Sequence, residues 1–392
     1  MNVNVIEEMK KLIAIPSVTG EEARIGKYLY ERFTNMGCDT RLIEVEKERF
    51  NIFAVLPGTK KDDLGLIFHG HIDTILAYNM KSPFVPIVKN NHIWGRGSVD
   101  QKGGIASVIS AFEEIISSKK PLKYGVGFIG VIDEESEHRG SMNLKDTGIK
   151  AKYAIVTEPT GLKLGIGCKG TVPIKITVRG KTSHGCRPWL GVNAIEYGMK
   201  IASELLGEDL PIYKVKDIDE VKATLNLGIM KGGVAYNIVP NECILWFDRR
   251  LVPGENQFQV LNRIKEKIKK FEDCYNVVVV VEIARPDWNW PPIKKRGLKP
   301  ALTDMDSEIV QVIKASHREI IGDNPILFFT DGYNEMDFLI NDLGIPTVQY
   351  GPGDSGLCHT DEENIEINQL IKASLVYKTA IKNICEEDHN ES

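Results

Sequence analysis

Three apolar stretches of this chain are short enough to be single buried strands, and each ends in a histidine or a carboxylate. They are residues 64–73 (LGLIFHGHID), 124–135 (YGVGFIGVIDEE) and 151–159 (AKYAIVTEP). Segments 21–37 and 103–118 have the apolar spacing of amphipathic helices. Helices and strands that alternate in this way predict an α/β fold, with a mixed sheet layered by helices. In such open sheets ligands bind beyond the strand ends, where these polar residues would meet.

The sequence pattern changes near residue 170. Apolar and polar residues alternate along 171–180 as in a half-exposed strand, and the following segments read as helix, strand, strand, helix and strand. We interpret residues 171–286 as an inserted α+β domain of the ferredoxin-like type. Residues 287–392 return to the first pattern. The catalytic domain would therefore be discontinuous, with a first part at 1–170 and a second part at 287–392.

The composition of the chain argues against several classes of function. A formal net charge of −5 over 392 residues, without a long block of one sign, indicates no nucleic-acid or membrane partner and favours a small molecule or peptide. No apolar stretch approaches the roughly 20 residues that cross a bilayer, and the first residues read as an amphipathic helix instead of a signal peptide. Seven cysteines without a Cys-x-x-Cys pair indicate reduced thiols. We therefore expect a cytoplasmic protein.

Five residues of metal-ligand type lie near these apolar stretches or in two further polar segments. They are His71, Asp100, Glu135, Glu158 and His359. Zn²⁺ prefers imidazole nitrogen and carboxylate oxygen, and a catalytic zinc keeps one position for water. Three carboxylates, two neutral imidazoles and one hydroxide would balance two divalent ions. The sequence therefore predicts a site for two divalent metal ions, zinc by preference, with cobalt or manganese as alternatives.

The candidates at positions 71 and 100 also have plainer interpretations. Taken alone, His71 would be a hydrogen-bonded core histidine, but in His-x-Asp the alternation of a strand places Asp73 on the same face, where it can fix the imidazole tautomer. We expect His69 to pack or to support the site. Asp100 has the position of a helix N-cap before 103–118. Both roles are compatible, because a cap uses one carboxylate oxygen and a bridge between two ions uses both.

Glycines and acidic neighbours surround the candidates. We expect the four glycines near Asp100 to let the backbone approach an ion closely. They are Gly95, Gly97, Gly103 and Gly104. The acidic run 133–135 would be a solvated turn in the plainer interpretation, but carboxylates that end an apolar strand raise one another's pKa unless a cation compensates. Glu158, between an apolar strand and the turn PTG, carries the weakest individual signal.

A set of motifs resembles the zinc-dependent acetylornithine deacetylase and succinyl-diaminopimelate desuccinylase family, which also contains aminoacylases and glutamate carboxypeptidases. The motifs are GHIDT, GRGSVDQKGG, DEES, TEPTG, GKTSHG, NIVPNE, DRRLVPGE and GPG followed by CHT, and they extend over nearly the whole chain. The resemblance implies a zinc-dependent hydrolase that acts on amide C–N bonds in peptides or other substrates. It also implies a cis peptide bond after Asp100 and an inserted domain that acts as a lid and commonly as a dimer interface.

The resemblance also implies a role for each residue at the site. One metal ion would be held by His71 and Glu158 and the other by Glu135 and His359, with Asp100 as a bridge between the ions. Glu134 would be the general base, and Asp73 would support His71 from behind.

The substrate-contacting positions that the resemblance implies fall mainly in the inserted domain. His184 in KTSHG is expected to act as a catalytic residue at the oxyanion, and Asn237 in YNIVP to bind substrate. Arg250 in FDRRLVPGE suits a substrate carboxylate, because a planar guanidinium can form paired hydrogen bonds to it. Thr330 is the remaining candidate, in FFTDGYNEMDF, where many members have a Gly-Gly-Thr pattern. We expect a homodimer that forms through the inserted domain.

The resulting hypothesis is hydrolysis of the amide bond of an N-acyl amino acid, of the deacetylase or desuccinylase type, or of a short peptide. A broad-specificity metallo-carboxypeptidase, a dipeptidase or an aminopeptidase with the same site is the alternative. A dehydrogenase would use the fingerprint at Gly165, Gly167 and Gly170, but here the fingerprint runs into a strand pattern instead of a helix. A serine hydrolase lacks a G-x-S-x-G motif. A non-catalytic binding module would not need every ligand type together with the base.

Overall fold

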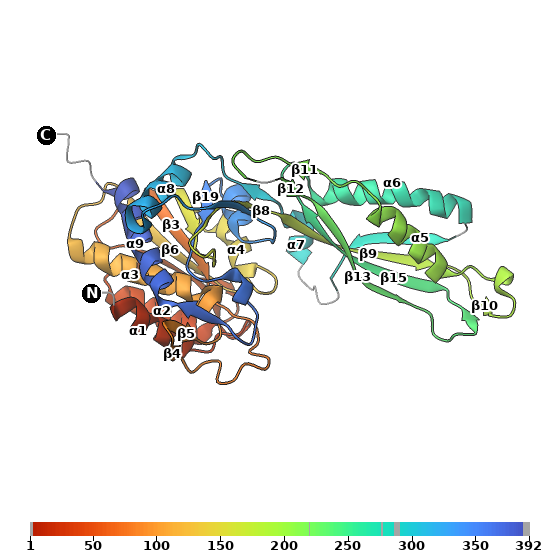
Figure 1. The fold of residues 1–392 in the computed structure, drawn as a ribbon, viewed down its shortest axis with the longest axis horizontal. Coiled ribbons are helices and arrows are strands. Elements are labelled where there is room, and N and C mark those ends of the chain that lie inside the picture. The colour runs from red at the N-terminus through yellow and green to blue at the C-terminus, as the bar shows by residue number, and fades with distance from the viewer. Residues whose placement is uncertain (1–2, 219, 276, 286–290, 387–392) are drawn as a thin grey trace. The chain divides into compact units, whose positions relative to one another are not determined.

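The computed structural model describes residues 3–218, 220–275, 277–285 and 291–386, and within it the chain forms two compact units (Figure 1). Unit 1 consists of Met1–Gly167, Leu302–Phe329 and Glu335–Ser392, and unit 2 consists of Cys168–Ala301 and Thr330–Asn334. Unit 2 therefore begins before and ends after the predicted range 171–286. It also includes a short segment from the later part of the chain.

One mixed sheet forms the centre of unit 1. Its strands, in spatial order, are β1 (Asp39–Glu46), β2 (Arg49–Val55), β6 (Gly125–Val131), β3 (Leu64–His71), β7 (Ala151–Val156), β19 (Thr347–Gln349), β8 (Leu164–Cys168) and β17 (Ala301–Leu302), and β18 (Leu327–Thr330) pairs with β8. β3 runs parallel to both of its neighbours, β6 and β7. β2 is antiparallel to β1 and to β6. The predicted mixed sheet is therefore confirmed.

Helices pack against the sheet of unit 1. They are α1 (Val3–Ile13), α2 (Ala23–Asn35), α3 (Gly103–Ser118), α4 (Arg139–Asn143), α8 (Glu308–Ile321) and α9 (Ile367–Cys385). α3 and α9 contact each other and β3, and all 8 residues of β3 are buried. Strands that are covered on both faces read as continuous apolar runs, which explains the sequence of this stretch.

Aromatic rings connect the central strands of unit 1 to these helices. Phe33 of α2 stacks on Phe128 of β6 with ring centroids 5.1 Å apart. Phe68 of β3 contacts Phe112 of α3 at 5.9 Å and Tyr377 of α9 at 5.0 Å. Such pairs contribute about 0.5–1.5 kcal/mol each beyond the area they bury. They hold β3 firmly, and with it the polar residues at its end.

Unit 2 contains a four-stranded antiparallel sheet with two helices. Along the chain its elements are β9 (Gly170–Arg179), α5 (Ala194–Leu206), β13 (Thr224–Gly232), β15 (Glu242–Leu251), α6 (Gln257–Tyr275) and β16 (Val278–Ile283). The strands lie side by side in the order β13, β15, β9, β16. This order of strands and helices is ferredoxin-like, as the alternating pattern predicts.

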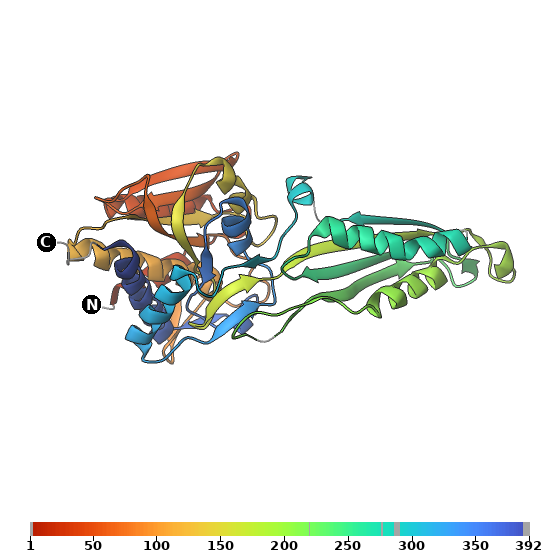
Figure 2. The ribbon, with the colours of Figure 1, turned by 90° about the horizontal axis from the view of Figure 1, so that it is seen from above.

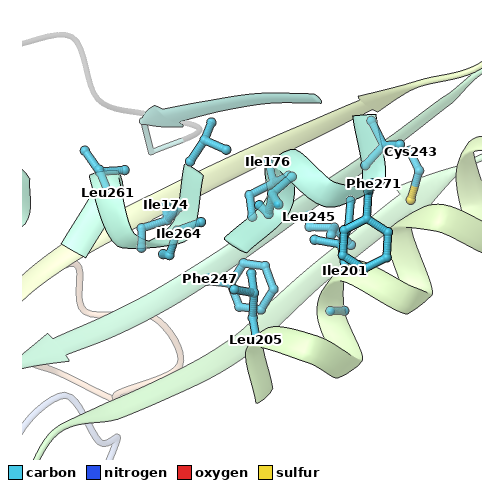
Figure 3. Close-up of a cluster of buried hydrophobic side chains, with 14 of the residues drawn as sticks. Ile174, Ile176, Ile201, Leu205, Cys243, Leu245, Phe247, Leu261, Ile264 and Phe271 are labelled. Atoms are coloured by element: carbon cyan, nitrogen blue, oxygen red, sulfur yellow. The ribbon is translucent and has the colours of Figure 1, made fainter. Parts of the chain in front are cut away.

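The core of unit 2 lies between its sheet and the two helices. Figures 1 and 2 show α5 and α6 on the same face of the sheet. Ile174 and Ile176 of β9 point to this face because side chains along a strand alternate. They pack in one buried cluster with Leu245 of β15, Leu205 of α5 and Ile264 of α6 (Figure 3). Full burial of each such side chain stabilises the unit by roughly 1.5–3 kcal/mol.

Several short elements complete the two units. Unit 1 has a small sheet of β4 (Ile87–Lys89), β5 (His92–Trp94) and β20 (Asn364–Glu366). Unit 2 has two short strand pairs, β10 (Ser183–His184) with β14 (Ile238–Val239) and β11 (Ile212–Tyr213) with β12 (Val221–Lys222). It also has the helix α7 (Pro291–Arg296). Among the helices of the described residues, none has both the length and the apolar character needed to cross a bilayer.

Candidate metal centre

Three of the predicted ligands follow neighbouring parallel strands. His71 is the last residue of β3, Glu135 follows β6, and Glu158 follows β7. β3 pairs in parallel with both of the other strands, and His71 lies opposite Val131, the last residue of β6. Because parallel strands end at the same edge of a sheet, the three side chains come to one edge.

Asp100 and His359 reach the same edge from loops. Asp100 lies in a short kinked segment, Ser98–Lys102, that precedes α3, and its own φ of −118° and ψ of 94° are not helical. The peptide bond from Asp100 to Gln101 is cis, as the resemblance implies. His359 follows a 3₁₀ turn, Ser355–Leu357, and has a positive φ of 64°. Its side chain is 52 % exposed, whereas that of Asp100 is 14 % exposed.

The carboxylate of Asp100 lies between the two histidines. Its Oδ1 is 2.8 Å from Nε2 of His71, and its Oδ2 is 3.3 Å from Nε2 of His359. Oε1 of Glu158 is 3.7 Å from Nε2 of His71, and Oε2 of Glu135 is 3.0 Å from Nε2 of His359. The structure thus brings all five predicted ligands together as two groups, one on each side of Asp100.

Burial and mutual repulsion dominate the protonation of the carboxylates. Burial raises the pKa of Glu135, although a hydrogen bond with His359 opposes it. Burial, together with the charge of Asp100, raises the pKa of Glu158 well above its ordinary value. Burial would also raise the pKa of Asp100, but hydrogen bonds with His359 and His71 lower it. Protons are therefore shared among these groups in the absence of a cation.

The two histidines have a high affinity for protons in this setting. Burial would lower the pKa of His71, but hydrogen bonds to Asp100 and Asp73 outweigh burial and raise it well above its ordinary value. Hydrogen bonds to Asp100 and Glu135 raise the pKa of His359 to about 10. Each imidazolium thus supplies positive charge that the surrounding carboxylates require.

The donor set fits divalent cations. Ligand atoms of His71, Asp100 and Glu135 all lie within 4.8 Å of one another. Buried carboxylates that repel one another cost free energy unless a positive charge lies among them. Mixed imidazole and carboxylate donors suit zinc, and they also suit cobalt and manganese. Metal ions bound to the histidines in place of protons would supply the positive charge that balances the same carboxylates.

Asp73 lies behind His71 and supports the site through both its backbone and its side chain. Nδ1 of His71 is 3.0 Å from the backbone carbonyl oxygen of Asp73, while the nearest carboxylate oxygen is 3.5 Å away. The carboxylate instead accepts hydrogen bonds from the backbone N–H groups of Glu134 (3.1 Å) and Glu135 (3.2 Å). It also accepts one from Oγ1 of Thr19 at 2.8 Å. Asp73 therefore holds His71 through its backbone and the segment after β6 through its side chain.

Glu134 lies beside the ligand group with most of its side chain covered. The side chain is 14 % exposed, and its Oε1 is 3.8 Å from Nδ1 of His138. Burial raises its pKa well above the ordinary value, and the neighbouring carboxylates of Glu135, Glu335 and Glu158 raise it further, whereas His71 lowers it. The group is therefore a carboxyl with a strong affinity for a proton.

Two of the glycines near Asp100 have a role other than the expected one. A Cβ on Gly104 would lie 2.3 Å from the carbonyl oxygen of Thr157, and a Cβ on Gly103 would lie 2.4 Å from a methyl carbon of Ile365. These glycines thus allow the start of α3 to pack against the end of β7 and against β20. Neighbouring residues fill the space that a Cβ would need at these two positions, and this close packing explains why both residues are glycine.

Gln101 was not among the predicted site residues, yet it contacts a ligand. Its Nε2 donates a hydrogen bond to Oε1 of Glu158, and its Oε1 accepts one from Oγ1 of Thr157 at 2.8 Å. The side chain is fully buried. Its place directly after Asp100 was the one available signal, because a buried amide next to a ligand must find polar partners.

Glu363 is a second residue that sequence reasoning missed. It lies four residues after His359 and directly before β20, and its side chain is buried. Its carboxylate accepts hydrogen bonds from the loop that carries Asp100. In the sequence it is the last member of the acidic run 361–363, which looks like a solvated turn. The apolar Ile365 that follows was the available sign of burial.

The four predicted substrate residues lie in unit 2, in two separate places. His184 and Asn237 lie together, since β10 pairs with β14 and the N–H of Gly185 donates to the carbonyl oxygen of Asn237 at 2.7 Å. His184 is exposed. Arg250 lies near the end of β15 and pairs in register with Thr171. The carbonyl oxygen of Thr330 accepts a hydrogen bond from Lys169, directly before β9.

These two places lie at opposite ends of the sheet of unit 2. In the ladder between β9 and β15, Arg250 pairs with Thr171, while Glu242 at the other end of β15 pairs with Arg179. His184 follows β9 beyond this second end. Eight residues along a strand span about 27 Å. The roles of the four residues in substrate binding stay predictions.

The segment that resembles a dinucleotide fingerprint has the wrong structure for one. Its glycines lie on β8 and at the start of β9, so the segment connects a strand to a strand. A dinucleotide site needs a helix at this point, whose N-terminus receives the pyrophosphate. The dehydrogenase alternative therefore has no structural support.

Comparisons with known proteins agree on one family. The sequence model described as Peptidase family M20/M25/M40 matches residues 67–383. A probable carboxypeptidase of Aspergillus clavatus is 28% identical over 399 residues, covering 97% of this chain and 88% of that protein. An acetylornithine deacetylase of Buchnera aphidicola is 26% identical over 398 residues, covering 98% of each.

Solved structures show the same fold. The aminopeptidase PepT from Bacillus cereus has a TM-score of 0.81 with 24% identity, covering 98% of this chain and 99% of that chain. The YXEP protein of Bacillus subtilis, described as a dinuclear metal binding peptidase, has a TM-score of 0.72 with 14% identity, covering 98% of each chain.

Proposed function

The chain belongs to peptidase family M20/M25/M40, and from this membership we propose that it hydrolyses the amide bond of an N-acyl amino acid or of a short peptide. It is a hydrolase of amide or peptide C–N bonds, as its relatives over nearly the whole chain are. The observation that carries the proposal is the position of Asp100, whose two carboxylate oxygens face His71 and His359 separately. A carboxylate that bridges two metal ions needs this arrangement.

The proposed cofactor is a pair of divalent metal ions, with zinc preferred and cobalt or manganese as alternatives. One ion would be held by His71 and Glu158, the other by Glu135 and His359, and both by Asp100. When bound, the ions supply Lewis-acid polarisation of the substrate carbonyl and lower the pKa of a water towards about 7. The B. subtilis protein, which is described as a dinuclear metal binding peptidase, supports the proposal of two metal ions.

Glu134 is the proposed general base. Its backbone is fixed by Asp73, and its largely covered carboxylate lies beside the ligand Glu135. A pKa raised by burial gives this carboxylate the affinity for a proton that a base requires, and neighbouring cations would bring that pKa down towards the working pH. Glu134 would take a proton from the attacking water and deliver it to the leaving amine.

Two residues of unit 2 are proposed to contact the substrate during the reaction. His184 would donate a hydrogen bond to the developing oxyanion, a type of contact worth roughly 3–4 kcal/mol. Arg250 would bind a substrate carboxylate. Its Nε and Nη2 donate to Oδ2 of Asp248 at 3.1 and 3.0 Å. A guanidinium has five N–H donors, so the pair with Asp248 orients Arg250 and leaves donors for a ligand.

The distance between these two residues supports a homodimer. Arg250 and His184 are about 27 Å apart along a strand direction within one unit, which exceeds the length of an N-acyl amino acid. If both contact one substrate, they come from different chains. We therefore propose that His184 and Asn237 of one chain complete the site of a second copy, with the inserted unit as the lid and dimer interface.

A carboxypeptidase or an aminopeptidase with the same metal centre is the second candidate function. The Aspergillus relative is described as a probable carboxypeptidase, and the B. cereus protein as an aminopeptidase. Arg250 favours substrates with a free carboxylate, because an aminopeptidase would need an acidic group for the substrate amine instead. A free carboxylate is common to N-acyl amino acids and to carboxypeptidase substrates.

A substrate panel tests the proposal. The metal-reconstituted protein is assayed with N-acetyl and N-succinyl amino acids and with dipeptides, and kcat/KM is measured for each compound and for its C-terminal amide. We expect turnover that needs the free carboxylate and disappears after chelation. Glu134→Ala should keep two metal ions and lose turnover, with Glu362→Ala as an exposed acidic control. Full turnover by Glu134→Ala with both ions bound would refute the assignment of the base.

A further inference from the structure

The side chain of Glu363 connects two loops that each carry a predicted ligand. It is 0% exposed, and each of its carboxylate oxygens accepts two hydrogen bonds. The donors are Nη1 of Arg96 (2.7 Å) and the backbone N–H groups of Gly97 (3.0 Å), Val99 (2.9 Å) and Asp100 (3.2 Å). Three contacts to backbone N–H groups within four residues fix the course of the chain as it enters Asp100.

The chain around Glu363 reinforces this connection. Its carbonyl oxygen accepts a hydrogen bond from the N–H of Gly95 at 3.2 Å. The next residue, Asn364, begins β20 and pairs with Trp94 of β5. The segment that carries His359 is thereby attached to the loop that carries Asp100, and Glu363 contributes both side-chain and backbone contacts to this attachment.

The other half of the metal centre depends less on this attachment, although it shares Asp100 with the first half. His71 ends a strand that is buried along its whole length, and its ring is held by the backbone carbonyl of Asp73. Glu158 follows the neighbouring strand and is held by Gln101. These two ligands take their positions from the central sheet, whereas His359 takes its position from a loop and is half-exposed.

The ion pair beneath the loops is costly to bury, which indicates that its geometry matters. Arg96 is 1% exposed, and among the described residues its Nε and Nη2 have no hydrogen-bond partner. Its charge is balanced by Glu363 at 2.7 Å. A buried ion pair seldom adds net stability over apolar residues of similar volume. The four directed hydrogen bonds of Glu363 are what an apolar replacement could not supply.

From this arrangement we propose that Glu363 is a positioning residue for the metal site of Glu135, His359 and Asp100, and that it affects the affinity of that site more strongly than the affinity of the site of His71 and Glu158. The inference rests on the proposed function. Without the carboxylate of Glu363, the backbone bond to Gly95 and the pairing of β20 with β5 still connect the two loops, but the segment Gly97–Asp100 loses its hydrogen bonds to the loop of His359, so the spacing of the two ligands is held less firmly.

Metal titration of the apoprotein tests the proposal. Zinc is added to metal-free wild-type protein and to Glu363→Gln and Glu363→Asp in a calorimeter, and Co²⁺ absorption spectra follow the coordination of each ion. We expect the weaker of the two affinities to fall by about 10–100-fold in Glu363→Gln, in line with other residues that orient metal ligands. The tighter affinity should fall by less, because His71 and Glu158 follow strands of the central sheet and share only Asp100 with the weaker site. Glu363→Asp should lie in between, and Glu362→Gln, on the exposed neighbour, should match wild type.

Turnover provides a second readout that separates positioning from general damage. At saturating metal, Glu363→Gln should regain most of the wild-type kcat, because the ion itself can gather its ligands. A variant that is damaged throughout would stay slow at any metal concentration.

The outcomes are distinguishable from failure of the proposed function. Equal weakening of both ions in Glu363→Gln, or no weakening, overturns the role of Glu363. Wild-type protein that binds fewer than two ions counts against the two-metal proposal instead. Where Glu363→Gln does not fold because Arg96 is left without its partner, the double variant Arg96→Met with Glu363→Gln removes both charges and is judged by the same criterion.

Discussion

At the scale of single residues, Asp73 joins the ligand group to the proposed base. Its backbone holds His71, while its carboxylate gathers the backbone N–H groups of Glu134 and Glu135. These are two tasks for one residue, and a change of side chain affects mainly the second, because the nearest carboxylate oxygen is 3.5 Å from Nδ1 of His71 and the carbonyl oxygen is 3.0 Å from it. The general base and the ligand beside it therefore depend on a carboxylate that contacts neither substrate nor metal.

Replacement of Asp73 by Asn tests this division. An amide has one acceptor oxygen, so its NH₂ group would face one of the two N–H groups that the carboxylate now accepts. We expect kcat/KM to fall by about 10–100-fold, as for other supporting residues of metal sites. The affinity of the tighter metal ion should change little, because the carbonyl at position 73 remains. Steady-state kinetics and calorimetry measure the two quantities, with Asp62→Asn as an exposed control. A loss of metal affinity as large as the loss of turnover would mean that the side chain supports His71 after all.

Metal binding should release protons. The pKa of His71 is raised well above its ordinary value and that of His359 is raised to about 10, so both are protonated at pH 7 in the metal-free protein. A metal ligand must be neutral imidazole, and each ion therefore displaces protons. Affinity should rise as pH rises from 6 to 9 and weaken as pH falls. Calorimetry in buffers of different ionisation enthalpy counts the protons, and His359→Gln should release fewer than His92→Gln. Proton uptake on binding would contradict the assignment.

The ligands could be predicted from the sequence because each has a local signature. His71 and Glu158 follow apolar runs that end abruptly, and Asp100 and His359 lie in motifs that carry a family resemblance. Glu363 and Gln101 have no such signature. Their roles depend on contacts across more than 50 residues of chain, such as the bond from Gln101 to Glu158. Adjacent carboxylates in a sequence do not reveal which one turns inward.

At the scale of elements, close packing at the start of α3 connects the helix to the metal centre. A Cβ on Gly104 would clash with the carbonyl oxygen of Thr157, the residue before Glu158. Gly26, near the start of α2, differs, because a Cβ there would meet its nearest atoms at ordinary contact distances of 3.7 and 3.9 Å. The two helical glycines form a matched pair.

Alanine at these two positions should have opposite effects. Gly104→Ala should lower the free energy of unfolding by about 1–3 kcal/mol, the usual cost of overpacking, and should weaken metal binding because Glu158 shifts. Gly26→Ala should raise it by up to about 1 kcal/mol, since alanine is the better helix former. Thermal and urea denaturation of the metal-free proteins measure both. Equal effects at the two sites would show that helix propensity outweighs the contact with Thr157.

The elements themselves were largely predictable, because their patterns are strong. The order of helix, strand, strand, helix and strand that the sequence indicates after residue 180 appears in the structure as α5, β13, β15, α6 and β16, and α5 begins at Ala194 after an Asn193 cap. The limits of unit 2 were less accessible. Its first residue, Cys168, lies inside the last part of β8, so no loop or change of composition marks the border. Short strands such as β17 and β19 are too brief for a periodic signal.

At the scale of the whole molecule, a dimer in which each unit 2 completes the site of the other copy explains why His184 and Arg250 are so far apart. Each active site would then contain Glu134 of one chain and His184 of the other. Loss of either residue should abolish the activity of a homodimer. The two losses fall in different sites of a mixed dimer, and this asymmetry can be measured.

Mixing two inactive variants should therefore restore activity. Glu134→Ala and His184→Ala are purified, combined in equal amounts, and allowed to exchange subunits. In a mixed dimer one site has both defects, and the other has an intact Glu134 with an intact His184 from the partner chain. Random assortment makes half of the dimers mixed, so activity should reach about a quarter of wild type, given twofold symmetry. Light scattering establishes the dimer. The control is a mixture of Glu134→Ala with Asp73→Asn. Each of these two residues acts in the site of its own chain, so the mixture should be no more active than the Asp73 variant alone. No recovery despite proven exchange would place His184 in the site of its own chain or outside the reaction.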